Sequence, residues 1–238
     1  MDRHFDIQLD KLKTKIIKMC SLVDEQLDFT LKLFENVNTD LAISIIDRDE
    51  KVDKYDVKIE RICQRIFALN QPVAMDLRVI MSAITINTNL ERIGDITTNI
   101  AESFLRLGEK PAFFEQTKIP AMGASVKEMI KNSIDAYIEG SSALAQKVIA
   151  NDDIVDNLNR ENHKVLIEIM KEKPANIEPG IELLGISKQL ERIGDHATNI
   201  AEDIFFINEA QLIKHKYEKY HILQNEDEDE FEDTDEPD

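Results

Sequence analysis

The sequence predicts an all-α protein built as two tandem antiparallel three-helix bundles, six long helices in all, followed by a disordered acidic C-terminal tail. Three observations support this fold class. A thirteen-residue segment starting at Leu90 returns at Leu190 with eleven identical positions, so one structural unit occurs twice. The 238 residues include seven Gly, six Pro and no Trp, a composition typical of helical proteins. Apolar residues also recur at helical spacing through most of the chain.

The first half contains three helical segments separated by short breaks. Apolar spacing predicts a helix over residues 4–35. Thr39 is the expected N-cap of a second helix, which ends near residue 69. Pro72 suits the opening of a third helix. That helix carries the first copy of the repeat and should end near Gly108, because glycine favours the C-terminal position of a helix.

The second half follows the same plan after a linker. Helices are expected over residues 121–139, from the break at Gly140 to about Lys173, and from a ragged turn at 174–180 to about residue 216. The expected divisions are a first repeat at 1–108, a linker at 109–120, a second repeat at 121–218 and the tail at 225–238.

Charge and cysteine content exclude several classes of protein. The net charge is −18, and the last fourteen residues hold ten acids and no base, which leaves about −8 on the body by subtraction. An acidic body without a basic patch argues against nucleic acid and against anionic lipid. No apolar run predicts a membrane span, and residues 1–11 are too polar for a signal peptide. Cys20 and Cys63 are expected to be reduced core thiols of a cytoplasmic protein.

Four pairs of acidic residues stand four positions apart, so the two carboxylates of each pair share a helix face. Two pairs lie inside the repeated segment and two precede it, with matching flanks in the two halves. They are Asp49 with Asp53, Glu91 with Asp95, Asp152 with Asp156, and Glu191 with Asp195.

The spacing of these pairs places them side by side across two predicted helical hairpins. Positions 49 and 95, and likewise 53 and 91, are centred on Pro72, the turn between the second and third helices. The corresponding pairs of the second half are centred between Lys173 and Pro174. Residues equidistant from the turn of an antiparallel helix pair lie level with one another. Each half therefore gathers four carboxylates.

Four carboxylates at one level repel one another unless cations lie among them. Oxygen ligands suit Mg²⁺, Mn²⁺ and iron rather than a structural zinc site. A solvated acidic face would explain a single pair, but four pairs in register favour metal binding. Gly94 and Gly194 recur next to the acids although glycine is unfavourable inside a helix, which predicts that another backbone or a metal cluster approaches closely. Arg92 and Arg192 are expected to pair with nearby acids.

No catalytic arrangement is recognisable in the sequence. The Glu-x-x-His pattern of di-iron bundle enzymes is absent after both Glu91 and Glu191, and His196 lies off the acidic stripe, at its boundary. The chain has no glycine-rich phosphate loop and no Ser-His-Asp or Cys-His arrangement. We expect a protein that is not an enzyme.

The duplicated Leu-Glu-Arg-Ile-Gly-Asp segment, preceded in each half by Asp49–Asp53 or Asp152–Asp156, resembles the PhoU family of phosphate-uptake regulators over residues 4–216. The resemblance implies two three-helix bundles and metal contacts by all eight acids, with iron, zinc, manganese or magnesium as the metal. It makes Asn99 and Asn199 candidates for outer-sphere contacts only. The acidic tail is an extension that the family pattern does not require.

The resemblance also implies a function and partners. It predicts a cytoplasmic homodimer that restrains phosphate uptake through the ATPase subunit of a Pst-type phosphate ABC transporter and relays the state of that transporter to a sensor histidine kinase. The alternatives are an accessory protein of a Pit-type transporter, a carboxylate-bridged metalloenzyme and a purely structural scaffold.

Overall fold

The computed structural model describes residues 3–211 and 213, and all regular secondary structure in that part of the chain is helical. The all-α fold class and the six helices are thereby confirmed. The predicted tail at 225–238 lies outside the described residues. The helices are α1 Arg3–Glu35, α2 Thr39–Asn70, α3 Ala74–Leu107, α4 Ile119–Glu139, α5 Ser142–Glu172 and α6 Ile177–Glu209, with short 3₁₀ turns η1 Phe114–Gln116 and η2 Pro174–Asn176.

Local capping explains where most helices begin and end. Gly108 and Gly140 adopt positive φ angles of 69° and 66° after α3 and α4, a conformation that glycine reaches without steric cost. Ser141 caps α5 by accepting from the amide of Leu144. The expected cap of α2 is corrected by one position: the side chain of Asn38, not Thr39, accepts from the Leu41 amide at 3.0 Å.

Helix α6 is shorter than the sequence predicted. It ends at Glu209 rather than near residue 216, because Ala210 takes a left-handed conformation with φ 59°. The side chains of Asn208 and Glu209 hydrogen-bond the Ser142 hydroxyl at 3.4 and 2.6 Å. These bonds anchor the end of α6 to the turn between α4 and α5, a tertiary contact that apolar periodicity does not reveal.

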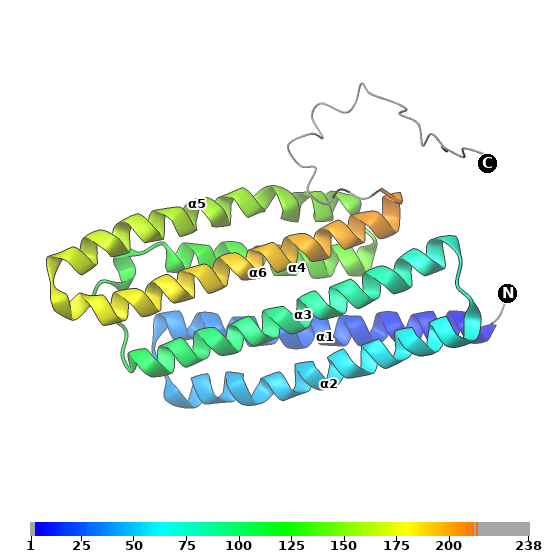
Figure 1. The fold of residues 1–238 in the computed structure, drawn as a ribbon, viewed down its shortest axis with the longest axis horizontal. Coiled ribbons are helices and arrows are strands. Elements are labelled where there is room, and N and C mark those ends of the chain that lie inside the picture. The colour runs from blue at the N-terminus through cyan, green and yellow to red at the C-terminus, as the bar shows by residue number, and fades with distance from the viewer. Residues whose placement is uncertain (1–2, 212, 214–238) are drawn as a thin grey trace, which may run out of the picture.

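The six helices form two antiparallel three-helix units, α1–α3 and α4–α6, which lie side by side (Figure 1). Their apolar faces merge into one core, since α3 packs along α6 and α1 packs on α4. A cluster of Phe34, Phe104 and Phe114, with ring centroids 5.7–6.5 Å apart, fills the end of this core where the linker crosses between units. In the described residues, no helix is long and apolar enough to cross a membrane.

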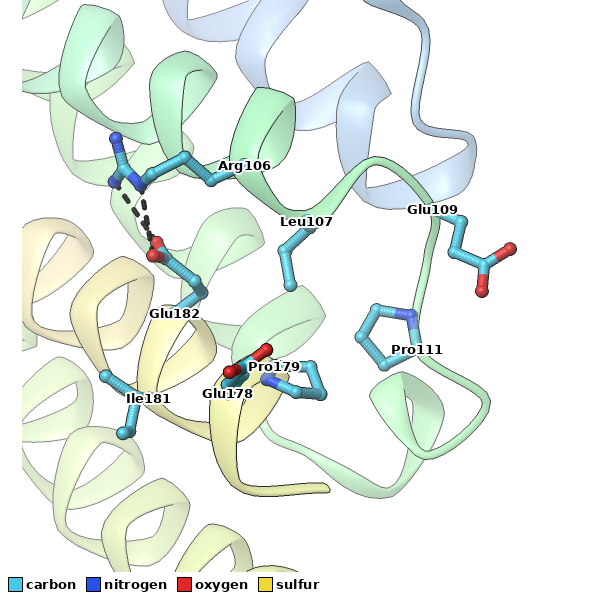
Figure 2. A pocket seen from close by; sticks show the side chains of 8 residues that line it. All are labelled: Arg106, Leu107, Glu109, Pro111, Glu178, Pro179, Ile181 and Glu182. Carbon is cyan, nitrogen blue, oxygen red and sulfur yellow. Dashed lines mark hydrogen bonds and ion pairs between the residues drawn. The ribbon is translucent and has the colours of Figure 1, made fainter. Parts of the chain in front are cut away.

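The contact between α3 and α6, here called the seam, is antiparallel and has a defined register. Near its middle, Nδ1 of His196 donates to Oδ1 of Asn89 at 2.9 Å. At one end, the Arg106 guanidinium donates to both carboxylate oxygens of Glu182 at 3.0 and 3.1 Å (Figure 2). The two copies of the repeated segment therefore lie next to each other at the centre of the molecule.

Candidate metal centre

The structure places the acids of α2 beside those of α3, as the hairpin spacing predicted. A methyl group added at Gly94 would lie 2.7 Å from Oδ1 of Asp49, and one at Gly194 would lie 3.6 Å from Oδ1 of Asp152. The close approach predicted for the two glycines is therefore tight in the first half and ordinary in the second. The nearest atom is the Asp49 oxygen at Gly94 but Cγ1 of Val155, at 3.5 Å, at Gly194. The groups that approach the glycines in the described chain are therefore side chains, not another backbone.

The first acidic set joins α2 to α3 and consists of Asp49, Asp53, Glu91 and Asp95. Burial raises the pKa of Glu91 to about 7, and the neighbouring charges of Asp95 and Asp53 contribute in the same direction. Burial also raises the pKa of Asp49, reinforced by Asp53 and Asp95, while a hydrogen bond from Gln26 opposes the shift. Because these interactions cross between the helices, the carboxylates are close enough to repel one another.

The second acidic set joins α5 to α6 in the same way and consists of Asp152, Asp156, Glu191 and Asp195. Burial raises the pKa of Asp195 to about 6, with further contributions from Glu191 and from both aspartates of α5. Burial and the charge of Asp156 likewise raise the pKa of Asp152. Both predicted sets of four are thus brought together by the fold.

Two residues near the first set were missed by the sequence reasoning. Asp56 accepts a hydrogen bond from Asn87 at 2.5 Å, and its charge contributes to the raised pKa of Glu91. Positions 56 and 87 are also nearly equidistant from Pro72, so the hairpin spacing contained a signal for Asp56. Gln26 donates to Asp49 at 3.2 Å from α1, and the spacing of the α2–α3 hairpin contains no signal for it.

The two sets differ in charge at equivalent positions. Asn159 and Ser187, bonded at 2.8 Å, occupy in the second half the places of Asp56 and Asn87. Lys188 stands where the first half has Thr88, and it binds the Glu191 carboxylate at 2.5 and 2.6 Å. The first set therefore has an additional acid nearby and lacks the lysine of the second set.

Basic side chains partly neutralise both sets. Arg92 reaches Asp95 at 3.1 Å and Glu91 at 3.4 Å, which confirms the expected pairing. Arg192 instead donates to the side chain of Gln189 at 3.3 Å. Its predicted pairing with an acid is not seen among the described ion pairs. Lys188 provides the positive charge at the second set.

The donor chemistry of both sets fits an oxygen-preferring cation. The buried hydroxyl of Thr98, one turn beyond Asp95, lacks a hydrogen-bond partner, and the space at Gly94 leaves room for the Asp49 carboxylate. Among residues 3–211 and 213, however, no three His, Cys, Asp or Glu side chains are arranged to hold a metal ion. A cation bound at either set would compete with Arg92 or Lys188 for the carboxylates.

His196 belongs to the seam rather than to the acidic sets. Its bond to Asn89 is joined by a donation from Asn199 to the same oxygen at 3.4 Å. Burial lowers the pKa of His196, and the charges of Arg192 and Arg92 lower it further. The neutral ring therefore acts as a hydrogen-bond donor between the halves. This agrees with its predicted boundary position and places Asn199 at the seam.

A cavity of about 430 Å³ at the end of the seam is another concave candidate (Figure 2). Glu109, Glu178 and Glu182 line it together with Arg106, whose guanidinium is already bound by Glu182. Three carboxylates would repel a bound anion such as phosphate, and the one cation of the lining is already neutralised by Glu182. The acidic sets remain the better candidates for a functional site.

Comparison with known families identifies the architecture. The sequence model of the PhoU domain matches residues 16–104 and again 119–204, one match in each half. The chain belongs to the PhoU family. The two matches contain all eight acids of the candidate centre.

Relatives and solved structures agree with this membership. A protein of Aquifex aeolicus named as a phosphate-specific transport system accessory protein PhoU homolog is 38% identical over 212 residues, which cover 89% of this chain and 96% of that protein. A homolog of the same name from Zymomonas mobilis is 37% identical over 202 residues, 85% of each chain. The crystal structure of PhoU from Pseudomonas aeruginosa superimposes with a TM-score of 0.83 at 29% identity and covers 87% of this chain and all of that one.

Gly94 and Gly194 of this PhoU-family protein have unequal space around them. Replacing each with alanine should therefore change the free energy of unfolding by different amounts. Alanine is favoured over glycine inside a helix by about 1 kcal/mol. Gly194→Ala should therefore raise the free energy of unfolding by up to that amount. Gly94→Ala should give a smaller gain or a loss, because its methyl group displaces the Asp49 carboxylate and presses on Val52. Urea denaturation of chelator-treated protein measures both, and equal effects would contradict the asymmetry.

The raised pKa values predict how pH affects stability without metal. Glu91 and Asp195 have folded pKa values of about 7 and about 6, above their ordinary values of 4.5 and 3.8. At a pH between the ordinary and the folded pKa of either group, the folded state binds more protons than the unfolded state. The free energy of unfolding should therefore fall as pH rises from about 4 to 7.

Urea midpoints of chelator-treated protein, measured across this pH range, test the expected fall. The double variant Glu91→Gln, Asp195→Asn is the comparison, since it retains every other titrating group, His196 included. The urea midpoint of this variant should fall less steeply with pH than that of the unmodified chain. An equally steep fall would contradict the assignment of the repulsion to these two carboxylates.

Proposed function

We propose that this chain is a non-enzymatic, metal-binding adaptor that negatively regulates phosphate uptake and phosphate-starvation signalling. The observation that carries the proposal is the duplicated acidic set, which lies at equivalent positions of two PhoU domains. Relatives of similar length are named accessory proteins of the phosphate-specific transport system. This name favours a Pst-type transporter over a Pit-type transporter as the regulated partner.

The metal would be held by Asp49, Asp53, Glu91 and Asp95 in the first half, and by Asp152, Asp156, Glu191 and Asp195 in the second. Iron, zinc, manganese and magnesium are the candidates, and ligand sets made only of oxygen favour magnesium, manganese or iron. A bound cation would neutralise the carboxylates and tie α2 to α3 and α5 to α6. Each set has one neighbouring cation, Arg92 in the first and Lys188 in the second, so the additional charge of Asp56 makes the first set the stronger attractor.

The proposed partners are the ATPase subunit of the transporter, a sensor histidine kinase and a second copy of the chain, all met in the cytoplasm. Exposed apolar surface is one mark of a contact site for a protein partner. Met81 and Ile181, one hundred positions apart, are 54% and 58% exposed on α3 and α6. Leu77 and Ile177 repeat the same relation one turn earlier. Both halves therefore present similar apolar side chains to a partner.

Removing one carboxylate from each set should abolish retention of metal. In the double variant Asp95→Ala, Asp195→Ala, the metal content of protein purified without chelator should fall at least about 10-fold, as elemental analysis measures it. Each single variant should keep the metal of the set that remains intact, and Asp195→Ala should keep more than Asp95→Ala because the first set attracts the cation more strongly.

The matched control is Glu128→Ala, Glu168→Ala, which removes two exposed acids that pair with lysines away from both sets. It should keep the metal content of the unmodified chain. Full metal content in the double aspartate variant would refute metal binding at these positions.

Deletion of the gene should relieve the proposed restraint on uptake. Phosphate accumulation, measured with labelled phosphate, or expression of phosphate-starvation genes should rise in phosphate-rich medium. The unmodified chain supplied in trans should restore both to the original level. If neither quantity changes on deletion, the regulatory assignment is wrong, whatever the metal content of the protein.

A further inference from the structure

A groove of about 460 Å³ between α1 and α2 carries an unexpected concentration of positive charge. Lys18 of α1 and Lys51, Lys54 and Lys58 of α2 line it around the ring of Tyr55. The expectation that the acidic body lacks a basic patch is therefore wrong. Lys51, Lys54 and Lys58 share one face of α2, and Lys18 joins them only because α1 and α2 pair along their lengths.

The positive charge continues along both helices beyond the groove. Arg61 and Arg65 follow Lys58 at three and seven positions, and Lys11 and Lys15 precede Lys18 at seven and three. Residues at these spacings share a helix face, and all but Lys15, which is half-buried, are exposed. The result is a basic strip that runs along two neighbouring helices.

Little of this charge is neutralised by the described part of the chain. Lys54 pairs with Glu50 at 2.8 Å, and Glu25, which also lines the groove, is bound by Arg48. For Lys18, Lys51 and Lys58, no ion pair with a described carboxylate exists. The Lys58 ammonium lies 5.0 Å from the centroid of the Tyr55 ring, and that of Lys15 lies 5.7 Å from it. The groove can therefore accept an acidic ligand.

The sequence contains a segment of complementary charge. Residues 225–238 hold ten acids, no base and the apolar Phe231. A chain with net charge −18 repels other acidic molecules at long range, whereas a segment joined covalently to the groove acts at a high effective concentration. Both considerations favour the chain's own tail over a nucleic acid or an anionic membrane.

Along the molecule, the end of α6 lies close to one end of the groove, about one turn of α1 before Lys18. Glu209 bonds Ser142 beside the α4–α5 turn. Helix α4 runs antiparallel to α1, with Lys127 bound to Asp24 and Asp28 at 2.6 and 2.8 Å. Helix α4 ends at Glu139, twelve residues after Lys127. Because the two helices are antiparallel, this end is level with a point twelve residues before Asp24 and Asp28 on α1, about residue 14, next to Lys15.

The lateral distance from the end of α6 to the groove is also within reach of the tail. It amounts to two or three helix spacings, roughly 20–30 Å. Residues 210–224, which connect α6 to the acidic segment, can span up to about 50 Å when extended. The connecting segment is therefore long enough to bring residues 225–238 to the lysines.

We propose that the acidic segment 225–238 binds within its own chain to the lysine groove between α1 and α2. The interaction is between opposite charges, so it should weaken as ionic strength rises and as acidic competitors are added. This inference concerns a surface separate from the metal centre and does not depend on the proposed function.

Carbodiimide cross-linking of the full-length chain tests the contact directly, because the reagent joins a carboxylate to a lysine amine only where the two groups touch. Mass spectrometry should find amides between residues 226–238 and Lys18, Lys51, Lys54 or Lys58. These amides should disappear near 1 M salt, where the screening length is about 3 Å. An equal mixture of isotopically light and heavy chains should give only light–light and heavy–heavy products.

Two charge-reversal variants separate a specific contact from general attraction. K51E/K54E/K58E should lower the yield of tail cross-links to Lys15 and Lys18 roughly threefold or more. K164E/K171E/K173E makes the same change of charge on exposed lysines at the end of α5 and should leave the yield unchanged. Equal losses in both variants, light–heavy products or even labelling of lysines over the whole surface would each overturn the proposal. The salt series on the unmodified chain tests the contact independently of how either variant folds.

Discussion

The antiparallel packing of α3 on α6 is the contact on which the rest of the molecule depends. It is fixed near the centre by the bond between Asn89 and His196 and at one end by the ion pair of Arg106 with Glu182. A slip of one helical turn, about 5.4 Å, would break both. With the register held, the two copies of the repeated segment cross at the same level. Each copy then meets its own partner, α2 or α5, so the two acidic sets lie on either side of one seam.

This arrangement concentrates negative charge that the fold must tolerate. Burial and neighbouring carboxylates raise the pKa of Glu91 and Asp195 to about 7 and about 6, so part of each set is held in an unfavourable ionised state at neutral pH. Arg92 and Lys188 relieve some of the repulsion. Such crowding is unfavourable for stability alone, and it suits a site that exchanges internal ion pairs for a cation.

The two halves share a backbone plan and have diverged in chemistry. Asp56 has its counterpart in Asn159, Thr88 in Lys188, and buried Ile96 in the hydrogen-bonding His196. Gly94 sits tightly against a carboxylate, whereas Gly194 leaves ordinary contact distance. The duplication therefore supplies symmetry of position without equality of charge. Reversing the charge on one lysine or acid at a time can address one half without disturbing the other.

The sequence by itself determined the six helices and the neighbours of each acid across a hairpin. This succeeded because periodicity reports which face is buried, and residues equidistant from a short turn must lie level. Only the tertiary structure decided the contacts between helices that no short turn joins: Gln26 at Asp49, His196 at Asn89 and the anchored end of α6 at Glu209. Whether a carboxylate meets a lysine, an arginine or another carboxylate depends on that packing, because local spacing sets the face of a helix and not what lies opposite it.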